Sequence, residues 1–467
     1  MRHLGLAAFL LATAATTVTT AIAQDISLNR PGSGARAAGM GNAFIAVSDD
    51  GTAASWNPAG LSQLRKPEFS LVHNSSRRSR YLEGYRTLDR SAAYTNLATT
   101  SSIANLEFAS AAVPFRLASK PVTLQVGWRR LYRLANQLQG DTRRVALSAI
   151  ARPESTVRIN GNTDGSIDVW SFAGAVGITN RLSLGASLDL YHGEWDERSD
   201  LNEDPGVFGP TDFLSTTSSN GLSGHALNLG LLLAYPSVSL GFVYHGPLRG
   251  DFSDTYSLRS SLIEPIDGTT PPDAELRFPK SFGAGVAWRP RPLLRLALDV
   301  TYNQWTRFVV KGLTEPADVF LSGFDGLPPE LSATRDTVSL NLGMEKLFPA
   351  KGVYVPLRLG MAYEPQGGRD PLLRDDLVYT VLAVGTGVNT NSLKFDVALE
   401  YRWGSARTSQ DFSLVYGVGG AVELGLPPPP ETQGTAGLRE WRLKVSVIYR
   451  IANTEKLGGF LKKVFGS

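Results

Sequence analysis

Apolar and polar side chains alternate one by one in segment after segment of this 467-residue chain. From Leu393 to Gly404 the odd positions hold Leu, Phe, Val, Leu, Tyr and Trp, and the even positions hold Lys, Asp, Ala, Glu, Arg and Gly. Successive side chains of a β-strand point to opposite faces of a sheet, so this period of two predicts strands with one apolar face. The pattern recurs in Leu294–Asn303 and in Trp441–Ile451.

Fourteen segments fit such a strand: 68–76, 103–115, 122–133, 167–179, 181–195, 223–235, 238–248, 281–290, 293–305, 335–348, 354–365, 379–390, 393–404 and 439–451. The connections between them mostly alternate between one to five residues and long stretches such as 134–166, 196–222, 249–280, 306–334 and 405–438. Short turns at one end and long loops at the other are typical of bacterial outer-membrane barrels. A Greek-key sandwich has no reason to sort its loops in this way. We assign 141–160 to an outer loop, because a strand at Val145–Ile150 would make the strand number odd.

The sequence therefore predicts an all-β protein, with residues 67–451 forming a transmembrane antiparallel β-barrel of about fourteen strands in the bacterial outer membrane. An even number of strands returns both ends of the barrel to the periplasm. Six tryptophans near strand ends are expected to form an interfacial girdle: Trp128, Trp195, Trp288, Trp305, Trp403 and Trp441. The chain has no cysteine, and its net charge of +3 gives no case for nucleic acid as a partner.

Both ends of the chain carry segments outside the barrel. Residues 1–23 have the form of a secretory signal peptide, with Arg2, a short apolar stretch and the A-x-A cleavage site Ala21-Ile22-Ala23 before Gln24. A membrane anchor is the alternative, but the apolar stretch is short for one. We expect residues 452–467 to form a periplasmic amphipathic tail; the alternative is a disordered periplasmic tail. Its apolar residues have helical spacing: Leu457, Phe460, Leu461, Val464 and Phe465.

Residues 24–66 do not alternate and are rich in glycine and turn signals. Gly39-Met40-Gly41 permits close backbone packing or a turn, because glycine has no side chain to obstruct either. Asp49-Asp50-Gly51 and Asn57-Pro58-Ala59-Gly60 are further turn signals. A small, mildly apolar segment ahead of the first strand predicts a plug inside the lumen.

This segment resembles the start of the FadL/TodX family of outer-membrane transporters for long-chain fatty acids and other hydrophobic compounds. The resemblance rests on 34–44, on Asp49-Asp50 and on 56–61, with weaker matches at 278–283, 298–300, 305–306, 357–363 and Pro365. We take as plug-motif residues Gly39, Gly41, Phe44, Asp49, Asp50, Trp56, Asn57 and Pro58. The same motif occurs in PorV-like relatives, which serve type IX secretion.

The resemblance implies a fourteen-stranded barrel blocked by an N-terminal hatch. It also implies that outer loops catch a hydrophobic ligand, which passes to a site above the plug and leaves sideways through the wall after a plug shift. The expected partners are hydrophobic small molecules, outer-membrane lipid, lipopolysaccharide and the barrel assembly machinery, with no cofactor. The alternative function is that of a PorV-like component of a protein secretion system.

Charged residues at alternate strand positions are expected to face the lumen: Asp189, Arg295, Asp299, Glu345, Arg358, Lys394, Asp396, Glu400, Arg402, Arg442 and Lys444. One interpretation is that they pair with each other and hold the plug. The other is that a basic residue binds a ligand carboxylate, and the candidates are Arg295, Arg358, Lys394 and Arg402. A cluster at the outer end of the first strand, Arg77, Arg78 and Arg80, either binds lipopolysaccharide phosphates or is simply solvated.

Enzymatic and metal-binding functions find little support in the sequence. His73 and Ser75 suggest an acyl-transfer pair, but the pair lies at a strand end with no third group evident nearby. The histidines are scattered, whereas a metal site needs converging ligands. We therefore expect no catalytic residues, no metal and no enzymatic activity.

Overall fold

A computed structural model describes residues 32–87, 92–146, 154–208, 210–261, 264–269, 274–311, 320–321, 334–369, 375–408 and 432–451. The expected signal peptide at 1–23, the first part of the plug and the expected tail at 452–467 lie outside these residues.

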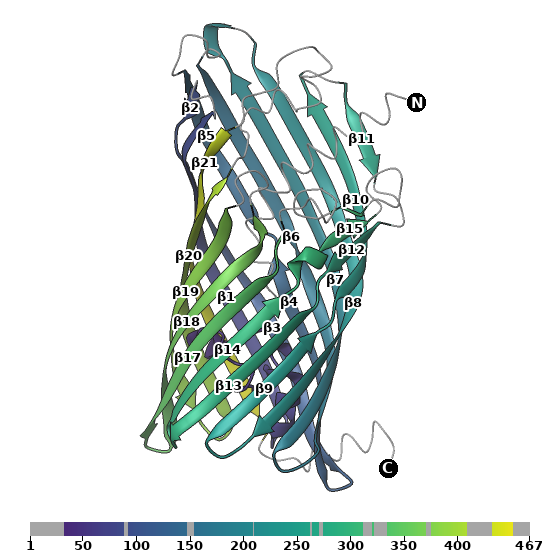
Figure 1. The fold of residues 1–467 in the computed structure, drawn as a ribbon, viewed down its shortest axis with the longest axis vertical. Coiled ribbons are helices and arrows are strands. Elements are labelled where there is room, and N and C mark those ends of the chain that lie inside the picture. The colour runs from purple at the N-terminus through teal and green to yellow at the C-terminus, as the bar shows by residue number, and fades with distance from the viewer. Residues whose placement is uncertain are drawn as a thin grey trace.

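Fourteen strands form a closed antiparallel ring, in which each strand pairs with its two neighbours and the last, β21, pairs with the first, β1 (Figure 1). They are β1 (Glu68–Thr87), β3 (Leu97–Leu117), β4 (Lys120–Arg133), β6 (Ser155–Gly177), β7 (Leu182–Asp204), β8 (Asp212–Ala234), β9 (Val238–His245), β13 (Ser281–Arg291), β14 (Leu294–Asn303), β17 (Thr337–Ala350), β18 (Val353–Arg369), β19 (Asp376–Asn389), β20 (Leu393–Thr408) and β21 (Thr432–Arg450). The predicted barrel and its fourteen strands are confirmed.

The connections at one end of the ring, the turn end, are short. Two of them, Ala118-Ser119 and Lys351-Gly352, have positive φ at both residues, the geometry of the tight turns that suit twisted hairpins. Glu68 pairs with Arg450 at this end, so the barrel starts and finishes there. The opposite end, the loop end, carries the longer connections.

The loop end holds more regular structure than the alternation predicted. The ring strands β6, β7 and β8 each continue to 23 residues. Among the described residues, seven further strands join them beyond the ring: β2 (Ala92–Tyr94), β5 (Asn136–Ala146), β10 (Leu248–Ser260), β11 (Ile266–Thr269), β12 (Glu275–Phe278), β15 (Val309–Lys311) and β16 (Phe320–Leu321).

The assignment of 141–160 to an outer loop is therefore wrong for 141–146 and 155–160, which are strand, whereas 147–153 lie outside the described residues. The described parts of 134–166, 196–222 and 249–280 are likewise largely strand rather than loop. β5 pairs with β6 and β2 outside the ring, so the even strand number is kept. Only short apolar alternations occur there, such as Val157 and Ile159 on β6, so backbone pairing continues where the sequence pattern of a strand is weak.

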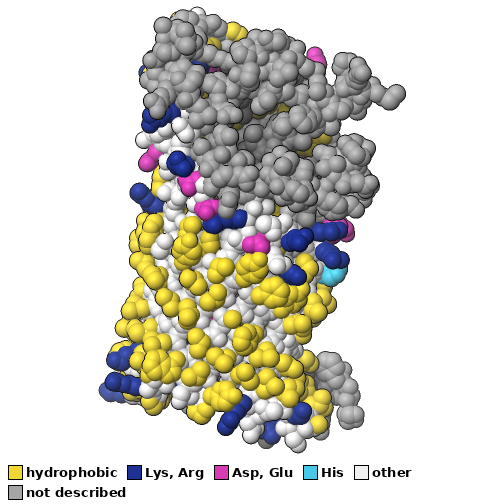
Figure 2. All heavy atoms as spheres, viewed as in Figure 1, with side chains coloured by type: hydrophobic (Ala, Val, Ile, Leu, Met, Phe, Trp, Pro, Cys, Tyr) yellow, Lys and Arg dark blue, Asp and Glu magenta, His cyan; other side chains and the backbone are white. Residues whose placement is uncertain are grey.

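The outward face of the ring is apolar. Leu71 is 53 % exposed while its neighbour Val72 is completely buried, and the strands of the ring repeat this alternation. Figure 2 shows the resulting belt of hydrophobic side chains, with lysine and arginine near its lower margin and charges of both signs along its upper margin. A belt of this kind bounded by polar rims matches the lipid-facing surface of an outer-membrane barrel. Among the described residues, no helix is both long and apolar enough to cross a membrane.

The expected tryptophan girdle is correct only in part. Trp288 and Trp441 are each 50 % exposed, and the ring of Tyr401 packs with both Trp441 and Trp403 on the outward face. Trp195 and Trp305 instead pack inside the lumen. Trp305 lies in the short 3-10 helix η4 (Trp305–Arg307), after the strand has ended, so strand alternation no longer sets its direction.

Residues 32–66, here called the plug, lie in the lumen towards the turn end, where their ribbon is inside the ring in Figure 1. Its described part contains helix α2 (Ala35–Gly39) and the 3-10 helices η1 (Ala53–Ser55) and η2 (Pro58–Gln63). α2 packs on β18 to β21, whereas η2 packs on β4 and β6 to β8. The plug therefore reaches both sides of the ring.

Candidate functional site

Glycines let the plug backbone touch the barrel wall directly. Gly41 has a φ of 61°, and a Cβ atom there would lie 2.5 Å from the backbone nitrogen of Met361 on β18. The reverse also holds, because a Cβ atom on Gly360 would overlap the backbone of Gly41. A Cβ atom on Gly39 would lie 3.0 Å from the Cα of Gly385 on β19. Both glycines of the plug motif are thus contact points with the wall.

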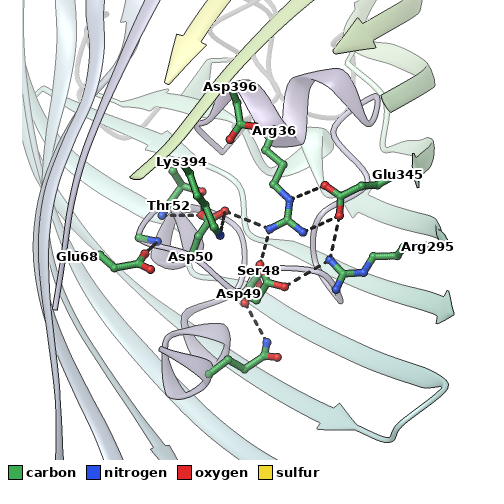
Figure 3. Close-up of polar contacts among 12 residues, drawn as sticks. Arg36, Ser48, Asp49, Asp50, Thr52, Glu68, Arg295, Glu345, Lys394 and Asp396 are labelled. Carbon is green, nitrogen blue, oxygen red and sulfur yellow. Dashed lines mark hydrogen bonds and ion pairs between the residues drawn. The ribbon is translucent and has the colours of Figure 1, made fainter. Parts of the chain in front are cut away.

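Arg36 is the centre of a buried charge network between plug and wall (Figure 3). Its guanidinium donates two hydrogen bonds of 2.9 Å to the carboxylate of Glu345 on β17. It also pairs with two plug carboxylates, those of Asp49 and, at 3.3 Å, Asp50. The predicted plug residues Asp49 and Asp50 therefore lie together on one arginine.

Three of the four candidate ligand-binding bases belong to this network. Arg295 lies 3.4 Å from Asp49, and Lys394 lies 3.8 Å from Asp50. Arg358 is 2.8 Å from Glu345 on one side and 2.8 Å from Asp396 on the other. The network counts four cations and four anions: Arg36, Arg295, Arg358 and Lys394 against Asp49, Asp50, Glu345 and Asp396. This balance compensates the cost of burying charge.

The fourth candidate, Arg402, lies apart from the plug network. It is buried against the ring of Tyr379, with its guanidinium carbon 3.7 Å from the ring centre. Its nearest carboxylates are those of Glu364 at 3.4 Å and Glu440 at 3.7 Å. Arg402 thus belongs to a second charged group on the wall, nearer the loop end.

The plug carboxylates are held in their ionised form. Burial alone would raise the pKa of Asp49, but the charges of Arg36, Arg295 and Lys394 outweigh it and hold that pKa well below its usual range. The pKa of Asp50 is lowered in the same way, since Lys394 and Arg36 overcome the effect of burial. Both plug carboxylates are therefore charged at neutral pH.

A second attachment joins the plug to β14. The Oδ2 atom of Asp299 accepts hydrogen bonds from the backbone nitrogens of Phe44, at 2.6 Å, and Ile45, at 2.7 Å. The Phe44 side chain packs edge-on against Trp56 within the plug, with ring centres 5.9 Å apart. Asp299 was expected only as one of several lumen charges, and its role follows from where the plug backbone runs.

Asn57 ties the plug to itself and to the wall. Its side-chain amide donates to the carbonyl oxygens of Ile45 and of Leu231 on β8, each at 3.1 Å. Its side-chain oxygen accepts from the nitrogen of Ala59 and so caps η2, in which Pro58 is the first residue. The predicted turn at Asn57 and Pro58 is therefore also a junction with the barrel.

A polar layer crosses the lumen wall on the loop side of the plug. The carboxylate of Asp189 on β7 accepts from Arg129 at 3.0 Å, from Ser171 at 2.7 Å and from Asn228 at 3.0 Å. These residues come from β4, β6, β7 and β8, the strands that also hold η2. This polar layer lies between the plug and the part of the lumen that is nearer the loop end.

Beyond this layer the lumen wall is apolar and aromatic. The cluster, here called the lumen cluster, consists of Tyr132, Leu134, Ile167, Val169, Tyr191, Leu222, Ala226, Leu248, Leu276, Phe278, Trp305 and Phe308. Phe278 is at its centre and contacts the rings of Tyr132, Trp305 and Phe308. An apolar surface inside a barrel is unusual, because barrel interiors are commonly polar.

Only part of this site can be predicted from the sequence. Sequence reasoning missed Arg129 and Tyr191, although alternation puts Arg129 on the same face as Gln125, and Tyr191 on the same face as Asp189.

The interpretation of Arg77, Arg78 and Arg80 as one outer cluster is wrong. Arg78 turns inward to Glu440, 3.1 Å away, and Arg80 is buried, so only Arg77 is on the outward face.

Within the described part of the chain, no three or more histidine, aspartate or glutamate side chains form a group that could hold a metal ion.

No protein-family model matches the chain, and no curated protein matches it in sequence. Solved structures do match over most of its length. A FadL homologue from Pseudomonas aeruginosa has a TM-score of 0.60 and 14 % identity, with 90 % of this chain and 98 % of that chain covered. The toluene transporter TbuX from Ralstonia pickettii has a TM-score of 0.56 and 16 % identity, covering 91 % and 99 %.

The toluene transporter TodX from Pseudomonas putida is similar at a TM-score of 0.55 and 14 % identity, with 91 % of this chain and 100 % of that chain covered. By name, two of these three structures are toluene transporters and the other is a FadL homologue. The chain therefore has the fold of the FadL- and TodX-type structures, as the resemblance of its N-terminal motif predicted.

Proposed function

We propose that this protein is an outer-membrane channel for the uptake of hydrophobic compounds, closed at rest by its N-terminal plug. The observation that carries the proposal is the lumen cluster. Side chains that face the lumen of a barrel are commonly polar, and they form hydrogen bonds with water and with each other. Barrel folding alone therefore does not explain a buried aromatic and aliphatic surface there. A hydrophobic ligand gains about 0.8 kcal/mol for each methylene that leaves water for such a surface.

The names of the similar structures agree with this proposal, since two of them transport toluene. Long-chain fatty acids are a second substrate class within the same proposal, implied by the FadL resemblance of the motif. In either case the ligand enters from the loop end, rests on the lumen cluster and continues after the plug shifts.

A sideways exit through the wall is part of the proposal. The pairing of β4 with β6 is interrupted between Arg130 and Tyr132, where Leu131 has no pairing partner on β6. Tyr132 belongs to the lumen cluster, so this irregularity lies beside the proposed ligand site. A wall that is already irregular opens at a lower cost than a regular ladder, because fewer hydrogen bonds must break.

The proposed location has consequences for other partners. The apolar belt would face lipid, and the barrel assembly machinery would insert the protein. On the outward face of the loop end, exposed Arg77 pairs in register with Trp441, and Arg439 lies over the ring of Tyr81 at 5.2 Å. Guanidinium groups suit phosphate, so we propose that these two arginines contact lipopolysaccharide.

Uptake measurements test the proposed function. Cells that depend on toluene or on a long-chain fatty acid for growth should take up the compound faster with this protein than with an empty vector. A loss-of-function variant, Phe278→Asp, puts a charge into the lumen cluster. It should abolish uptake while the barrel still assembles. Equal uptake with and without the protein, for both compounds, would exclude the transport role.

The alternative, a component of a protein secretion system, predicts a different outcome. In that case cells lacking the protein would retain secreted proteins, and the Phe278→Asp change inside the lumen would have no effect on their release.

A further inference from the structure

Two buried hydrogen-bond donors at the edge of the lumen cluster have no partner among the described residues. They are the Nε atom of Arg129 on β4 and the phenolic oxygen of Tyr191 on β7. The residues are 6 % and 3 % exposed, so bulk water does not satisfy them. Unpaired buried donors destabilise a protein, so two of them on strands that both pair with β6 require an explanation.

The two residues lie in one row across three neighbouring strands. Arg129 is directly opposite Val169 on β6, and Val169 is directly opposite Tyr191. All three are buried on the lumen side, and the outer two backbones are about 10 Å apart, which is two strand spacings. The long side chains of Arg129 and Tyr191 thus flank the short side chain of Val169.

This row is the boundary between two environments. On its turn side lies the polar layer of Asp189, which pairs in register with Ser171. On its loop side lies most of the lumen cluster, with Ile167 two residues along β6 and Leu222 across on β8. A molecule with an oxygen at one end and a hydrocarbon body matches such a boundary.

The charge of the row is already balanced. Asp189 compensates Arg129 at 3.0 Å. The other two arginines of this part of β4 also have carboxylate partners, Arg130 with Asp168 at 2.9 Å and Arg133 with Asp164 at 2.6 Å. An ionised ligand carboxylate would therefore add an uncompensated negative charge in a buried place, which is costly. An uncharged oxygen accepts hydrogen bonds without that cost.

We propose that Arg129 and Tyr191 bind the oxygen atom of an uncharged hydrophobic compound, such as a long-chain or aromatic alcohol. The hydrocarbon part of this ligand lies along the lumen cluster. This inference rests on the proposed function and narrows its substrate class: the preferred ligands are oxygenated but not ionised.

The test compares three probes of equal chain length, decane, 1-decanol and decanoate, at pH 8. Their binding to the full-length protein in lipid nanodiscs is measured by equilibrium dialysis, and binding to empty nanodiscs is subtracted. Tyr191→Phe removes one donor without changing the shape of the ring. Arg129→Lys keeps the charge opposite Asp189 but removes Nε. Tyr449→Phe is the matched control, because Tyr449 is 51 % exposed on the outward face.

The ratio of decanol binding to decane binding should fall about fivefold in Tyr191→Phe, the effect of losing one typical hydrogen bond. It should also fall in Arg129→Lys and should not change in Tyr449→Phe. An unchanged ratio in Tyr191→Phe, or stronger binding of decanoate than of decanol, would overturn the inference while decane binding still supports a hydrophobic channel. If none of the three probes binds, the proposed function itself fails, and the inference fails with it.

Discussion

Replacement of Arg36 by methionine should release the plug. Arg36 makes a two-bond contact with Glu345 and pairs with Asp49 and Asp50, and its side chain is only 10 % exposed. Methionine keeps much of the side-chain volume but leaves three cations facing four anions. Removing one partner from a buried ion network costs about 3–5 kcal/mol, because a charge is left uncompensated.

That cost acts on the equilibrium between the seated and the displaced plug. A change of 1.4 kcal/mol is a factor of ten, so the displaced form should become more populated by about two to three and a half powers of ten. Planar-bilayer recording measures this directly. The unaltered protein should show little steady conductance, and Arg36→Met should show frequent openings.

Two further variants make the result interpretable. Arg36→Met combined with Glu345→Gln restores a balance of three cations and three anions, so it should leak less than the single variant. Arg158→Met breaks an exposed ion pair with Asp141 and should not change conductance. The reasoning is wrong if Arg36→Met stays as closed as the unaltered protein, or if the double variant leaks more than the single one.

Three other measurements address the remaining attachments of the plug. Asn57→Ala removes hydrogen bonds to Ile45, Leu231 and Ala59 at about 1 kcal/mol each, so it should lower uptake of a hydrophobic substrate while the barrel still resists heat denaturation on gels; normal uptake would make Asn57 a turn residue only. Gly285→Ala would overlap the Asp299 carboxylate and should raise conductance, whereas Gly127→Ala has nothing closer than 3.6 Å and should not; equal conductance in both would contradict the close packing. Because the pKa values of Asp49 and Asp50 are lowered in the folded protein, the stabilisation from their ionised forms is complete above the unfolded value of about 3.9 and is lost as pH falls further. Hydrogen exchange of residues 36–52, corrected for intrinsic rates, should accelerate below about pH 4, and complete loss of protection by pH 6 would contradict this assignment.

The barrel could be predicted from the sequence because one pattern recurs in the strands of its apolar belt. Most outward residues of the belt are apolar, so Leu393, Phe395 and their equivalents mark both a strand and the face that it turns outward. The inward direction of charges such as Glu345 and Asp396 follows from the same alternation, and both are buried on the lumen side. Outside the belt this alternation is weak, so β5 and the extensions of β6 to β8 cannot be distinguished from loops in the sequence.

The candidate site was harder to predict, because it depends on register between strands that are distant in sequence. Alternation gives the face of Arg129, but its contact with Asp189 follows only once β4 and β7 are both aligned on β6. The contact of Arg36 with Glu345, 309 positions away, depends instead on where helix α2 lies inside the ring. Trp305 shows a different limit, since it follows the end of β14 and its direction comes from the short helix η4.

The two ends of the plug hold opposite arcs of the ring, α2 on the side of β18 to β21 and η2 on the side of β6 to β8. The plug is thus a strut across the barrel as well as a stopper in it. A strut fixes the distance between the arcs that it joins, so its displacement frees the cross-section of the ring to become rounder or flatter. Movement of a short N-terminal segment would in this way alter the shape of the whole wall, including the irregular part of β4 on the η2 side.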